Sequence, residues 1–331
     1  MSNSDLTSRE KSILERYLAR VNAVPKPELV PEESSQQKLI TSIVNSGVFP
    51  FSVDDLVNSG KDDFYDESRN NPKVYAGLSE TAYVGVPVSL EKCLSWVQLR
   101  NGVVATMPYL VAGLSVAKSD NYLRQRWHTA CSEELVGIDT VGIVNRGKPV
   151  VIVQHGNLIL TPDRIRTAYN TGLTKQNAAI LHPQQEIDTI LRGTHPVTGG
   201  SINLYTVDDI KKGKVKSPFG YYAVVLDFET AKDTLSNYQD KKTFLKNELV
   251  IARAGTLDYL EKYFDNIQSE NTVGNWHRFN EIDPKQAQGR VLFVTNNNNG
   301  LSGNFDLNYY ARFVGVAPEA QDKKSRRDAR K

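Results

Sequence analysis

The chain has 331 residues and a mass of 37.0 kDa, with 40 Lys and Arg against 38 Asp and Glu, a formal net charge of +2. Its 40% hydrophobic and 24% charged residues are ordinary for a globular protein, so global disorder is excluded. The length suits one large domain or two smaller ones. The near balance of charge excludes a nucleic-acid binder that is basic over its whole surface.

The two cysteines, Cys93 and Cys131, are too few for a disulfide framework in a chain of this length. No Cys-x-x-Cys pair occurs, so we expect no structural zinc, and nothing identifies a cofactor. The N-terminus, MSNSDLTSREKS, has no apolar segment of the kind found in secretory signals, and no run reaches the roughly 18 apolar residues of a membrane helix. We therefore expect a cytoplasmic protein without a membrane partner.

Residues 1–38 are predicted to form an N-terminal helix on a Pro-rich linker. Thr7 and Glu10 have capping-box spacing at the start of an amphipathic segment, 6–21. Three prolines and a polar run follow in VPKPELVPEESSQQ, which is typical of a linker. Two placements stay open: the helix packs on its own domain, or it packs on a neighbouring subunit of a homo-oligomer.

Residues 39–147 are predicted to form a mixed α/β region. It includes an acidic stretch, 54–72, that is typical of an exposed loop, and a short strand at 83–88. Ser89 is expected to cap the helix that follows. The helix would run through Gln98, with its buried face made by Leu90, Cys93, Leu94 and Val97.

The main α/β region is predicted at 148–316. PVVIVQ (149–154) is a continuous apolar strand, and Thr161-Pro162-Asp163 is a typical helix start. A second helix is expected at 183–192, a strand at 221–228, and a short helix at 229–235. Repeated strand–helix units indicate a partly parallel sheet.

The stretch LVIARAGTLDYLEKYF is interpreted as a strand at 249–254 followed by a helix that Thr256 caps. Two more strands, 290–295 and 309–316, are joined by a long Asn/Gly loop. The predicted fold class is therefore mixed α/β, or α+β: a mixed sheet flanked by helices. Residues 317–331, with six basic and three acidic residues, are predicted to be a basic, disordered tail.

Several strong catalytic motifs are missing from the sequence. It has no G-x-x-x-x-G-K-[ST] phosphate loop, no G-x-G-x-x-G after a strand and no H-E-x-x-H. Gly300-Leu301-Ser302-Gly303-Asn304 approaches the nucleophile elbow of hydrolases, but it lacks the final glycine and a strand-to-helix setting. These absences exclude several large enzyme classes but not enzymes in general.

The Asn/Gly loop offers a weak calcium alternative. If Gly300 is placed at the sixth position of a calcium loop, Asn297, Asn299 and Asp306 fall at the third, fifth and twelfth. The first position is then Thr295 rather than an aspartate, which leaves one carboxylate. We therefore predict no metal site, and a turn-rich loop is enough to account for the residues.

His155-Gly156-Asn157 is the first candidate site, because it lies between a buried strand and a helix start. His155 is a candidate catalytic acid or base. Gly156 and Asn157 are candidate ligand-binding residues, since free amides at such a turn can hold an anion or an oxyanion. The alternative is a tight turn with a hydrogen-bonded histidine.

Gly274-Asn275-Trp276-His277-Arg278-Phe279-Asn280 is the densest cluster of functional groups. His277 is a candidate catalytic residue, and the candidate ligand-binding residues are Asn275, Trp276, Arg278 and Asn280. In an extended segment, side chains alternate between faces, so Asn275, His277 and Phe279 would share one face and Trp276, Arg278 and Asn280 the other. A Trp–Arg stack on a sheet surface is the alternative.

Asp227, a candidate catalytic residue, and Arg253, a candidate ligand-binding residue, lie at or near predicted strand ends. If the strands before them are parallel neighbours of the strand before His155, all three side chains converge at one sheet edge, where ligands bind in open α/β sheets. Salt bridges at sheet edges are the alternative.

Three functions remain open. The first is binding of a small molecule or anion in a pocket, with or without catalysis of an unassigned reaction. The second is a non-catalytic, self-assembling structural or interaction protein, for which the 15 tyrosines and the separable first helix argue. The third is association with nucleic acid through the basic tail. The first predicts that His155 and His277 line one pocket.

Overall fold

A computed structural model describes residues 49–57, 74–78, 85–171, 173–174, 179–295, 300–305, 307 and 310–318. The chain divides into two units, Met1–Ser34 and Ser35–Lys331, and all described residues belong to the second. The predicted N-terminal helix and linker (1–38) lie outside the described residues, as do residues 58–72 of the acidic stretch and residues 319–331 of the tail.

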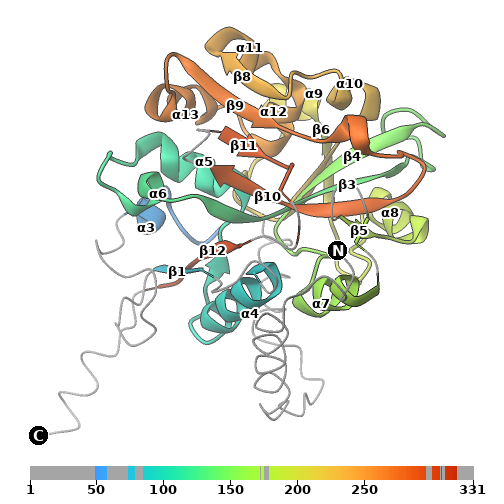
Figure 1. The fold of residues 1–331 in the computed structure, drawn as a ribbon, viewed down its shortest axis with the longest axis horizontal. Coiled ribbons are helices and arrows are strands. Elements are labelled where there is room, and N and C mark those ends of the chain that lie inside the picture. Colours follow the sequence, from blue (N-terminus) through green and yellow to red (C-terminus); the bar gives the residue numbers. More distant parts are fainter. Residues whose placement is uncertain are drawn as a thin grey trace, which may run out of the picture. The chain divides into compact units, whose positions relative to one another are not determined.

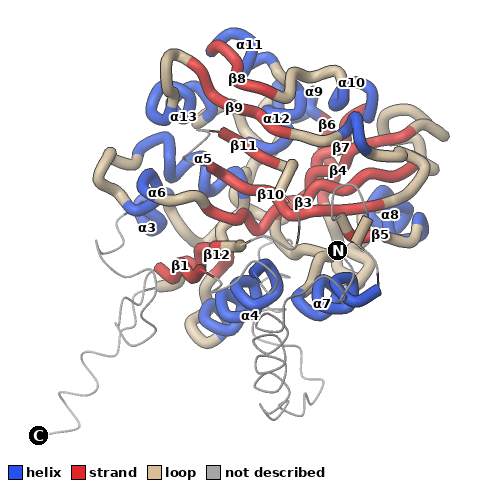
Figure 2. The backbone as a smooth tube through the Cα atoms, viewed as in Figure 1, coloured by secondary structure: helices blue, strands red, loops and turns tan. Residues whose placement is uncertain are grey.

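One large mixed sheet runs through the described part of the chain (Figures 1 and 2). Eight strands follow in the order β6-β7-β4-β3-β10-β11-β9-β8, and four shorter or off-path strands join them. The strands are β1 (Val74–Leu78), β2 (Val103–Val104), β3 (His128–Ile138), β4 (Pro149–His155), β5 (Ile180–Leu181), β6 (Asn203–Thr206), β7 (Tyr222–Asp227), β8 (Asn237–Asp240), β9 (Thr272–Trp276), β10 (Gln288–Thr295), β11 (Gly300–Ser302) and β12 (Arg312–Val316).

Both kinds of strand pairing occur in this sheet. β3 pairs antiparallel with β4 and with β10, and β4 pairs antiparallel with β7. β6 pairs parallel with β7, and β11 pairs parallel with β9. The predicted mixed sheet flanked by helices is therefore confirmed, although its centre is antiparallel.

Helices connect and cover these strands. None of the helices in the described residues is long and apolar enough to cross a membrane. They are α3 (Val53–Val57), α4 (Gly85–Gln98), α5 (Met107–Val116), α6 (Tyr122–Gln125), α7 (Pro162–Thr171), α8 (Gln184–Leu191), α9 (Val207–Lys211), α10 (Phe228–Lys232), α11 (Lys241–Lys246), α12 (Glu248–Ala254) and α13 (Leu260–Ile267), with the 3-10 helix η2 (Phe279–Glu281).

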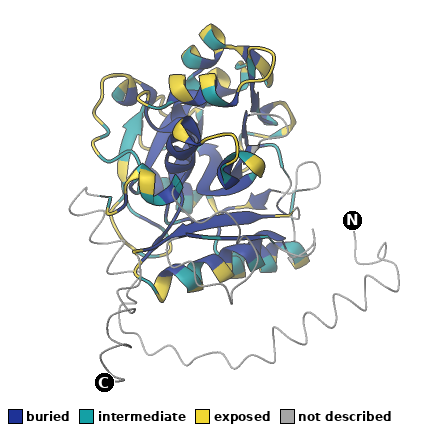
Figure 3. Ribbon diagram, turned by 90° about the vertical axis from the view of Figure 1, so that its left-hand side faces the viewer, coloured by how far each residue is buried: buried dark blue, intermediate teal, exposed yellow. Residues whose placement is uncertain are grey.

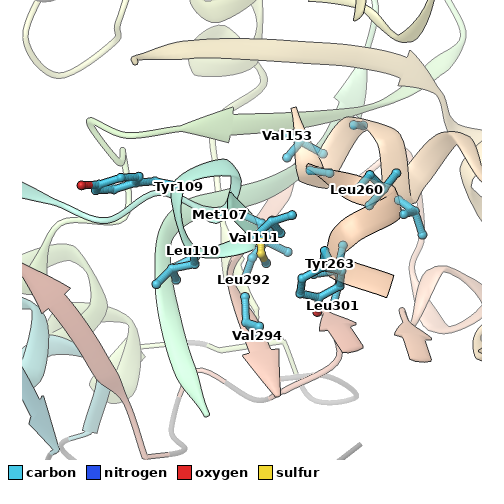
Figure 4. Packing of buried hydrophobic residues seen from close by; sticks show 14 of the residues in the cluster. Met107, Tyr109, Leu110, Val111, Val153, Leu260, Tyr263, Leu292, Val294 and Leu301 are labelled. Carbon is cyan, nitrogen blue, oxygen red and sulfur yellow. The ribbon is translucent and has the colours of Figure 1, made fainter. Parts of the chain in front are cut away.

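The main hydrophobic core lies between the sheet and α5, α12 and α13. Every residue of α5 from Met107 to Ser115 is buried, which explains why this helix is apolar all round. In Figure 4, Tyr263 of α13 lies beside Leu301 of β11, with residues of α5 close by. A second cluster packs α4 and α7 against the strands from another side (Figure 1), and the central strands are buried along their length (Figure 3).

Most elements predicted for the main region are present. The strand at 149–154 is β4, the strand at 221–228 is β7 and the strand at 290–295 is β10. α7 begins at Pro162, as the helix-start signal Thr161-Pro162-Asp163 predicted, and α8 (Gln184–Leu191) lies within the helix expected at 183–192. Leu90, Cys93 and Val97 of α4 are buried as expected.

The strand predicted at 249–254 is wrong, because these residues form helix α12. The Asn247 side chain caps its start by accepting from Val250 N at 3.2 Å, and Gly255 ends it in the left-handed conformation at φ 66°. All six residues from Leu249 to Ala254 are buried. A short apolar run buried on every side does not distinguish a helix from a strand by its periodicity.

Two smaller boundaries also differ from prediction. Residues 85–88 of the strand expected at 83–88 open α4 instead, and residues 83–84 lie outside the described part. Ser89 therefore sits inside the helix, where its hydroxyl donates to Gly77 O at 2.7 Å. Thr256 does not cap α13, because that helix begins at Leu260. The Thr256 Oγ1 instead accepts from Asp258 N at 3.2 Å.

Candidate functional site

Strands β9 and β11 bring together two sequence clusters that lie far apart in the chain. They pair in parallel, with Asn275 opposite Leu301 and Trp276 opposite Ser302. Just beyond the pair, Gly303 N donates to Trp276 O at 2.9 Å. The predicted GNWHRFN cluster and the segment first compared with a nucleophile elbow are thus neighbours in one part of the sheet.

Arg253 of α12 supports both segments from inside the protein. Its guanidinium is fully buried, and its Nε and Nη2 donate to Glu134 Oε2 at 3.1 and 2.7 Å. Its Nη1 donates to Asn275 Oδ1 at 2.8 Å and to Trp276 O at 3.0 Å. The paired charges and the shared main-chain oxygen hold β9 against α12 and β3 in a fixed position.

Gly303 completes this buried group because it leaves room for the ion pair. A Cβ at this position would lie 2.5 Å from Arg253 Nη2 and 2.9 Å from Glu134 Oε1. Its carbonyl accepts from Arg290 Nη1 at 3.1 Å. The end of β11 is therefore bound to the same internal cluster as the end of β9.

Side chains alternate along β9 and the residues after it, as the sequence predicted. Asn275, His277 and Phe279 are buried. Trp276 and Arg278 are half-buried, and Asn280 is exposed. The helices that pack against β9, α11 and α13, contribute Phe244 and Tyr263 to the core together with Val273 of β9. The buried set thus serves the interior, and the other set is half-buried or exposed, with the Nε1 atom of Trp276 itself buried.

The edge strand β8 adds residues to this outward side. Tyr238 pairs with Gly274 of β9 in antiparallel register, and its side chain is 42% exposed. The Tyr238 and Trp276 rings meet edge to face, with centroids 5.3 Å apart. β8 and β9 lie at the end of the strand order (Figure 1). We define the β8–β9 face as the half-buried and exposed residues Tyr238, Trp276, Arg278 and Asn280, together with the exposed Asn237, which starts β8 beside Tyr238.

His277 connects the chain before β8 to the end of β9 through hydrogen bonds. Its Nε2 donates to Thr234 O at 2.9 Å, and its Nδ1 accepts from Phe279 N at 3.4 Å. The Ser236 hydroxyl donates to His277 O and accepts from His277 N, both at 3.0 Å. Burial lowers the pKa of His277, and the positive charge of Arg253 adds to this effect. The ring is therefore neutral at pH 7.

Packing and hydrogen bonds fix the conformation of the HGN turn, His155-Gly156-Asn157. Gly156 has φ 67°, and a Cβ there would lie 1.8 Å from the Tyr221 ring. Asn157 has φ 44°, and its carbonyl accepts from Gln154 Nε2 and His195 Nε2, each at 2.7 Å. These contacts match the alternative of a tight turn, and Gly156 N itself donates to Cys131 O at 2.7 Å.

His155 is fully buried in a chain of hydrogen bonds. Met107 N donates to Ser132 Oγ at 2.9 Å, and the Ser132 hydroxyl donates to His155 Nδ1 at 2.9 Å. His155 Nε2 donates to Ala252 O at 3.0 Å. Burial lowers the pKa of His155 to about 3, so the neutral ring persists at pH 7. Both ring nitrogens are engaged by partners within the protein.

The predicted convergence of His155, Asp227 and Arg253 at one sheet edge is wrong. β4 and β7 are antiparallel, with Val150 opposite Asp227 and His155 opposite Tyr222, so His155 and Asp227 lie at opposite ends of the paired strands. Asp227 caps α10 by accepting from Thr230 N at 2.8 Å, and Arg253 is on a helix. The prediction fails because the neighbouring strands β4 and β7 are antiparallel and because residues 249–254 form a helix instead of a strand.

His155 and His277 are held by different partners. His155 donates to Ala252 O. Arg253, which follows Ala252 in the sequence, donates to Trp276 O at the end of β9, next to His277. α12 is thus the element through which the two histidine neighbourhoods are connected. A pocket shared by the two rings stays a prediction.

Two residues of this region, Glu134 and Tyr238, were not singled out from sequence, and Gly303 was considered only within the segment compared with a nucleophile elbow. Glu134 lies within β3 next to Glu133, and two adjacent acids inside the buried stretch TACSEELVG were the available signal. Tyr238 and Gly303 gave no distinguishing signal, since their roles arise from β8 pairing with β9 and from the Arg253 side chain nearby.

The described residues contain no group of three or more His, Cys, Asp or Glu side chains placed to hold a metal ion. Three positions of the weak calcium alternative, 297, 299 and 306, lie outside the described residues.

Comparisons with known proteins give one informative likeness. No protein-family model matches the chain, and no curated protein matches it. The fold is similar to that of a solved structure described as "Accommodation of massive sequence variation in Nanoarchaeota by the C-type lectin fold". The TM-score is 0.52 with 25% sequence identity, and the match covers 75% of this chain and 99% of that one.

Proposed function

We propose that this chain is a recognition protein with a C-type lectin-like fold, which binds another molecule through the β8–β9 face. One observation carries the proposal: β9 and the residues after it present a buried set of side chains that fixes the fold and a more exposed set, whose Trp276 contacts the Tyr238 ring of the neighbouring strand β8. Tyrosine and tryptophan are frequent anchors of binding surfaces, because they bury much area at little entropic cost.

The fold neighbour supports the same division of roles. It is described as a C-type lectin fold that accommodates massive sequence variation. In this chain, the Arg253–Glu134 pair and Asn275 supply contacts that do not depend on the side chains of the β8–β9 face. We infer that the residues of this face can be replaced while the fold is kept, which suits a surface whose specificity is set by its outer side chains.

Small-molecule binding with catalysis, the function first expected, has less support from the contacts. His155 and His277 bond to backbone carbonyls, and Asp227 caps a helix. Each side chain thus has a structural task that accounts for it. A ligand that touches Trp276, Arg278 and Asn280 remains part of the proposal, because these three candidate residues face outward.

A display library tests the proposal. Positions 237, 238, 276, 278 and 280 are randomised together, and the folded variants are selected for binding to immobilised lysozyme and, separately, to immobilised serum albumin. A matched library randomises five exposed residues on and just after α4: Glu91, Lys92, Ser95, Gln98 and Leu99. Both libraries are displayed on the full chain and screened for resistance to protease before selection.

The proposal expects the β8–β9 library to keep a protease-resistant fold and to yield binders that distinguish the two targets, at a rate well above that of the α4 library. Equal rates of binder recovery from the two libraries would contradict it. Loss of protease resistance in most β8–β9 variants would also contradict it, because these side chains would then be needed for the fold.

A further inference from the structure

We propose that Glu133 is a neutral carboxylic acid in the folded protein and donates its proton to the side-chain oxygen of Gln154. The hydrogen bond joins β3 to β4 beside the segment that leads from the HGN turn to α7, so this contact depends on a bound proton. The two strands lie at the centre of the strand order, away from the β8–β9 face, and the bond is independent of the function proposed for that face.

The register of the sheet places the two side chains next to each other. β3 and β4 are antiparallel neighbours (Figure 1), and Glu133 lies directly opposite Gln154. Residues in this relation project from the same face of the sheet, with Cβ atoms about 4.5–5.5 Å apart. Glu133 is 0% exposed and Gln154 is 2% exposed, so both side chains extend into the interior.

Both end groups reach the same short segment, which follows the HGN turn. Glu133 Oε1 accepts from Ile159 N at 2.7 Å, and Oε2 accepts from Leu160 N at 3.0 Å. Gln154 Nε2 donates to Asn157 O at 2.7 Å. Because the two side chains start side by side and end on one segment, the carboxyl group and the carboxamide are neighbours.

The Gln154 side-chain oxygen lacks a donor. The amide cannot be turned around, because Asn157 O only accepts and therefore requires the Nε2 group. Oε1 is buried and has no hydrogen-bond partner among the residues that the structure describes. An acceptor left in this state bears its full desolvation penalty. The O–H of a protonated Glu133 satisfies it, whereas a carboxylate would set acceptor against acceptor.

Burial and the nearby charges agree with the protonated form. Burial raises the pKa of Glu133 to about 8, although the N–H groups of Ile159 and Leu160 lower it. Arg164 of α7 favours the carboxylate and Glu186 of α8 disfavours it. These two side chains are paired with each other at 2.6 Å, so the guanidinium is engaged by Glu186. The Glu133 acid is therefore neutral at pH 7.

Three further titratable groups belong to these surroundings. His195 donates Nε2–H to a backbone carbonyl, and burial lowers the pKa of its ring. Cys131 precedes Glu133 by two residues on β3, and burial raises the pKa of its thiol to about 12. The His182 ring bonds to Glu186 Oε2 through Nδ1 at 3.0 Å. None of the three supplies an unmatched positive charge that would draw the proton from Glu133.

Carbon-13 NMR of the full chain measures the protonation state directly. The protein is labelled at the side-chain carboxyl carbon of glutamate, and the Glu133 signal is identified by its absence from Glu133→Gln. Above pH 6 the exposed glutamates are ionised, since their pKa is about 4.3. The Glu133 signal should keep the position of a protonated acid at pH 7 and titrate with a midpoint of about 8.

Labelled glutamine shows whether the proton is donated to Gln154. In the parent chain, the carboxamide carbon of Gln154 should shift with the same midpoint as Glu133, because its oxygen then loses the donor. Gln154→Met removes the acceptor but keeps a long side chain in the interior. The ionisation constant of Glu133 should rise about tenfold in this variant, which lowers the midpoint by about one pH unit.

Gln239→Met is the matched control. Gln239 is also 2% exposed, and its Nε2 donates to a backbone carbonyl, that of Leu235, at 2.6 Å. Its Oε1 accepts from Asn247 Nδ2 at 3.2 Å, and it lies on β8 at the end of the strand order. This variant should leave the midpoint of Glu133 unchanged.

A Glu133 side chain that is already ionised at pH 7 overturns the proposal. A Gln154 signal that does not follow the titration of Glu133 also overturns it, and this measurement holds even where Gln154→Met does not fold. Equal midpoints in Gln154→Met and the parent, or an equal fall in Gln239→Met, count against the bond in the same way. None of these results bears on whether the β8–β9 face recognises a ligand.

Discussion

Arg253 Nη2 lies 2.7 Å from Glu134 Oε2, and the two side chains are 0% and 3% exposed. The pair joins α12 to β3 in the interior, and the same guanidinium also holds the end of β9. Because burial removes both charges from water, each depends on the other for compensation. The pair therefore couples the support of the β8–β9 face to the stability of the whole sheet.

Removal of one partner of this pair should be costly. Arg253→Met leaves the Glu134 carboxylate buried and uncompensated, and we expect a loss of about 3–5 kcal/mol in the free energy of unfolding. The double variant with Glu134→Leu should recover part of the loss, since no buried charge then remains. Lys241→Met is the control: Lys241 pairs with Glu261 and Asp265 at the surface, where water screens the charges, so its loss should cost far less. Urea denaturation measures all three, and similar losses for Arg253 and Lys241 would contradict the prediction.

Gly303 tests how tightly the ion pair is packed. Gly303→Ala places a methyl group 2.5 Å from Arg253 Nη2 and should cost about 1–3 kcal/mol through displacement of the pair. Gly200→Ala is a suitable control, because the nearest atom to its added Cβ, Thr198 Oγ1, is 3.4 Å away, and we expect a change within about 0.5 kcal/mol. Equal melting temperatures for the two variants would show that the cluster has room to spare.

The sequence predicted the individual helices and strands better than the way in which they are arranged in the fold. Buried strands such as β4 and helix starts such as Pro162 were recognised because their signals are local. The direction of β7 relative to β4 could not be predicted from sequence, because a parallel and an antiparallel arrangement bury the same apolar residues. The sequence of α12 predicts a strand for a related reason: burial on all sides removes the polar face that marks a helix.

The candidate site was predicted in part. Burial alternates along GNWHRFN as the sequence predicted, but an extended chain with a period of two accounts only for the part in β9, because Phe279–Glu281 is a 3-10 helix. The partner of Arg253 could not be found this way. Glu134 lies 119 residues away in sequence, and only the fold brings the two together.

The HGN turn should be intolerant of a side chain at Gly156 for two separable reasons. Gly156→Ala adds a Cβ 1.8 Å from the Tyr221 ring at a φ of 67°. Gly199→Ala adds one at φ 71° with open space around it, so it isolates the backbone strain, which we expect to be about 1 kcal/mol. Gly156→Ala should cost more by about 1–3 kcal/mol for the displaced ring. Thermal denaturation of the pair measures the difference, and equal losses would mean that Tyr221 moves aside freely.

Stability should fall with pH below 6.5 because buried histidines must take up protons when the chain unfolds. Burial lowers the pKa of both His128 and His155 to about 3, against 6.5 for a solvated ring. The folded-state pKa lies below the unfolded-state pKa, so the stabilisation is complete above pH 6.5 and is lost as the pH falls toward 3. Each such group contributes a slope of at most about 1.4 kcal/mol per pH unit in this window.

A histidine variant isolates this contribution. Glu133 acts in the opposite direction, since burial raises its pKa to about 8, and its effect cancels when a variant is compared with the parent at each pH. His155→Gln keeps a donor for Ala252 O but has no titrating ring, so it should lose less stability than the parent between pH 7 and 5. Urea midpoints at pH 5, 6 and 7 measure the two slopes. Parallel slopes for variant and parent would show that His155 titrates alike in the folded and unfolded chain, and that its burial does not hold it neutral.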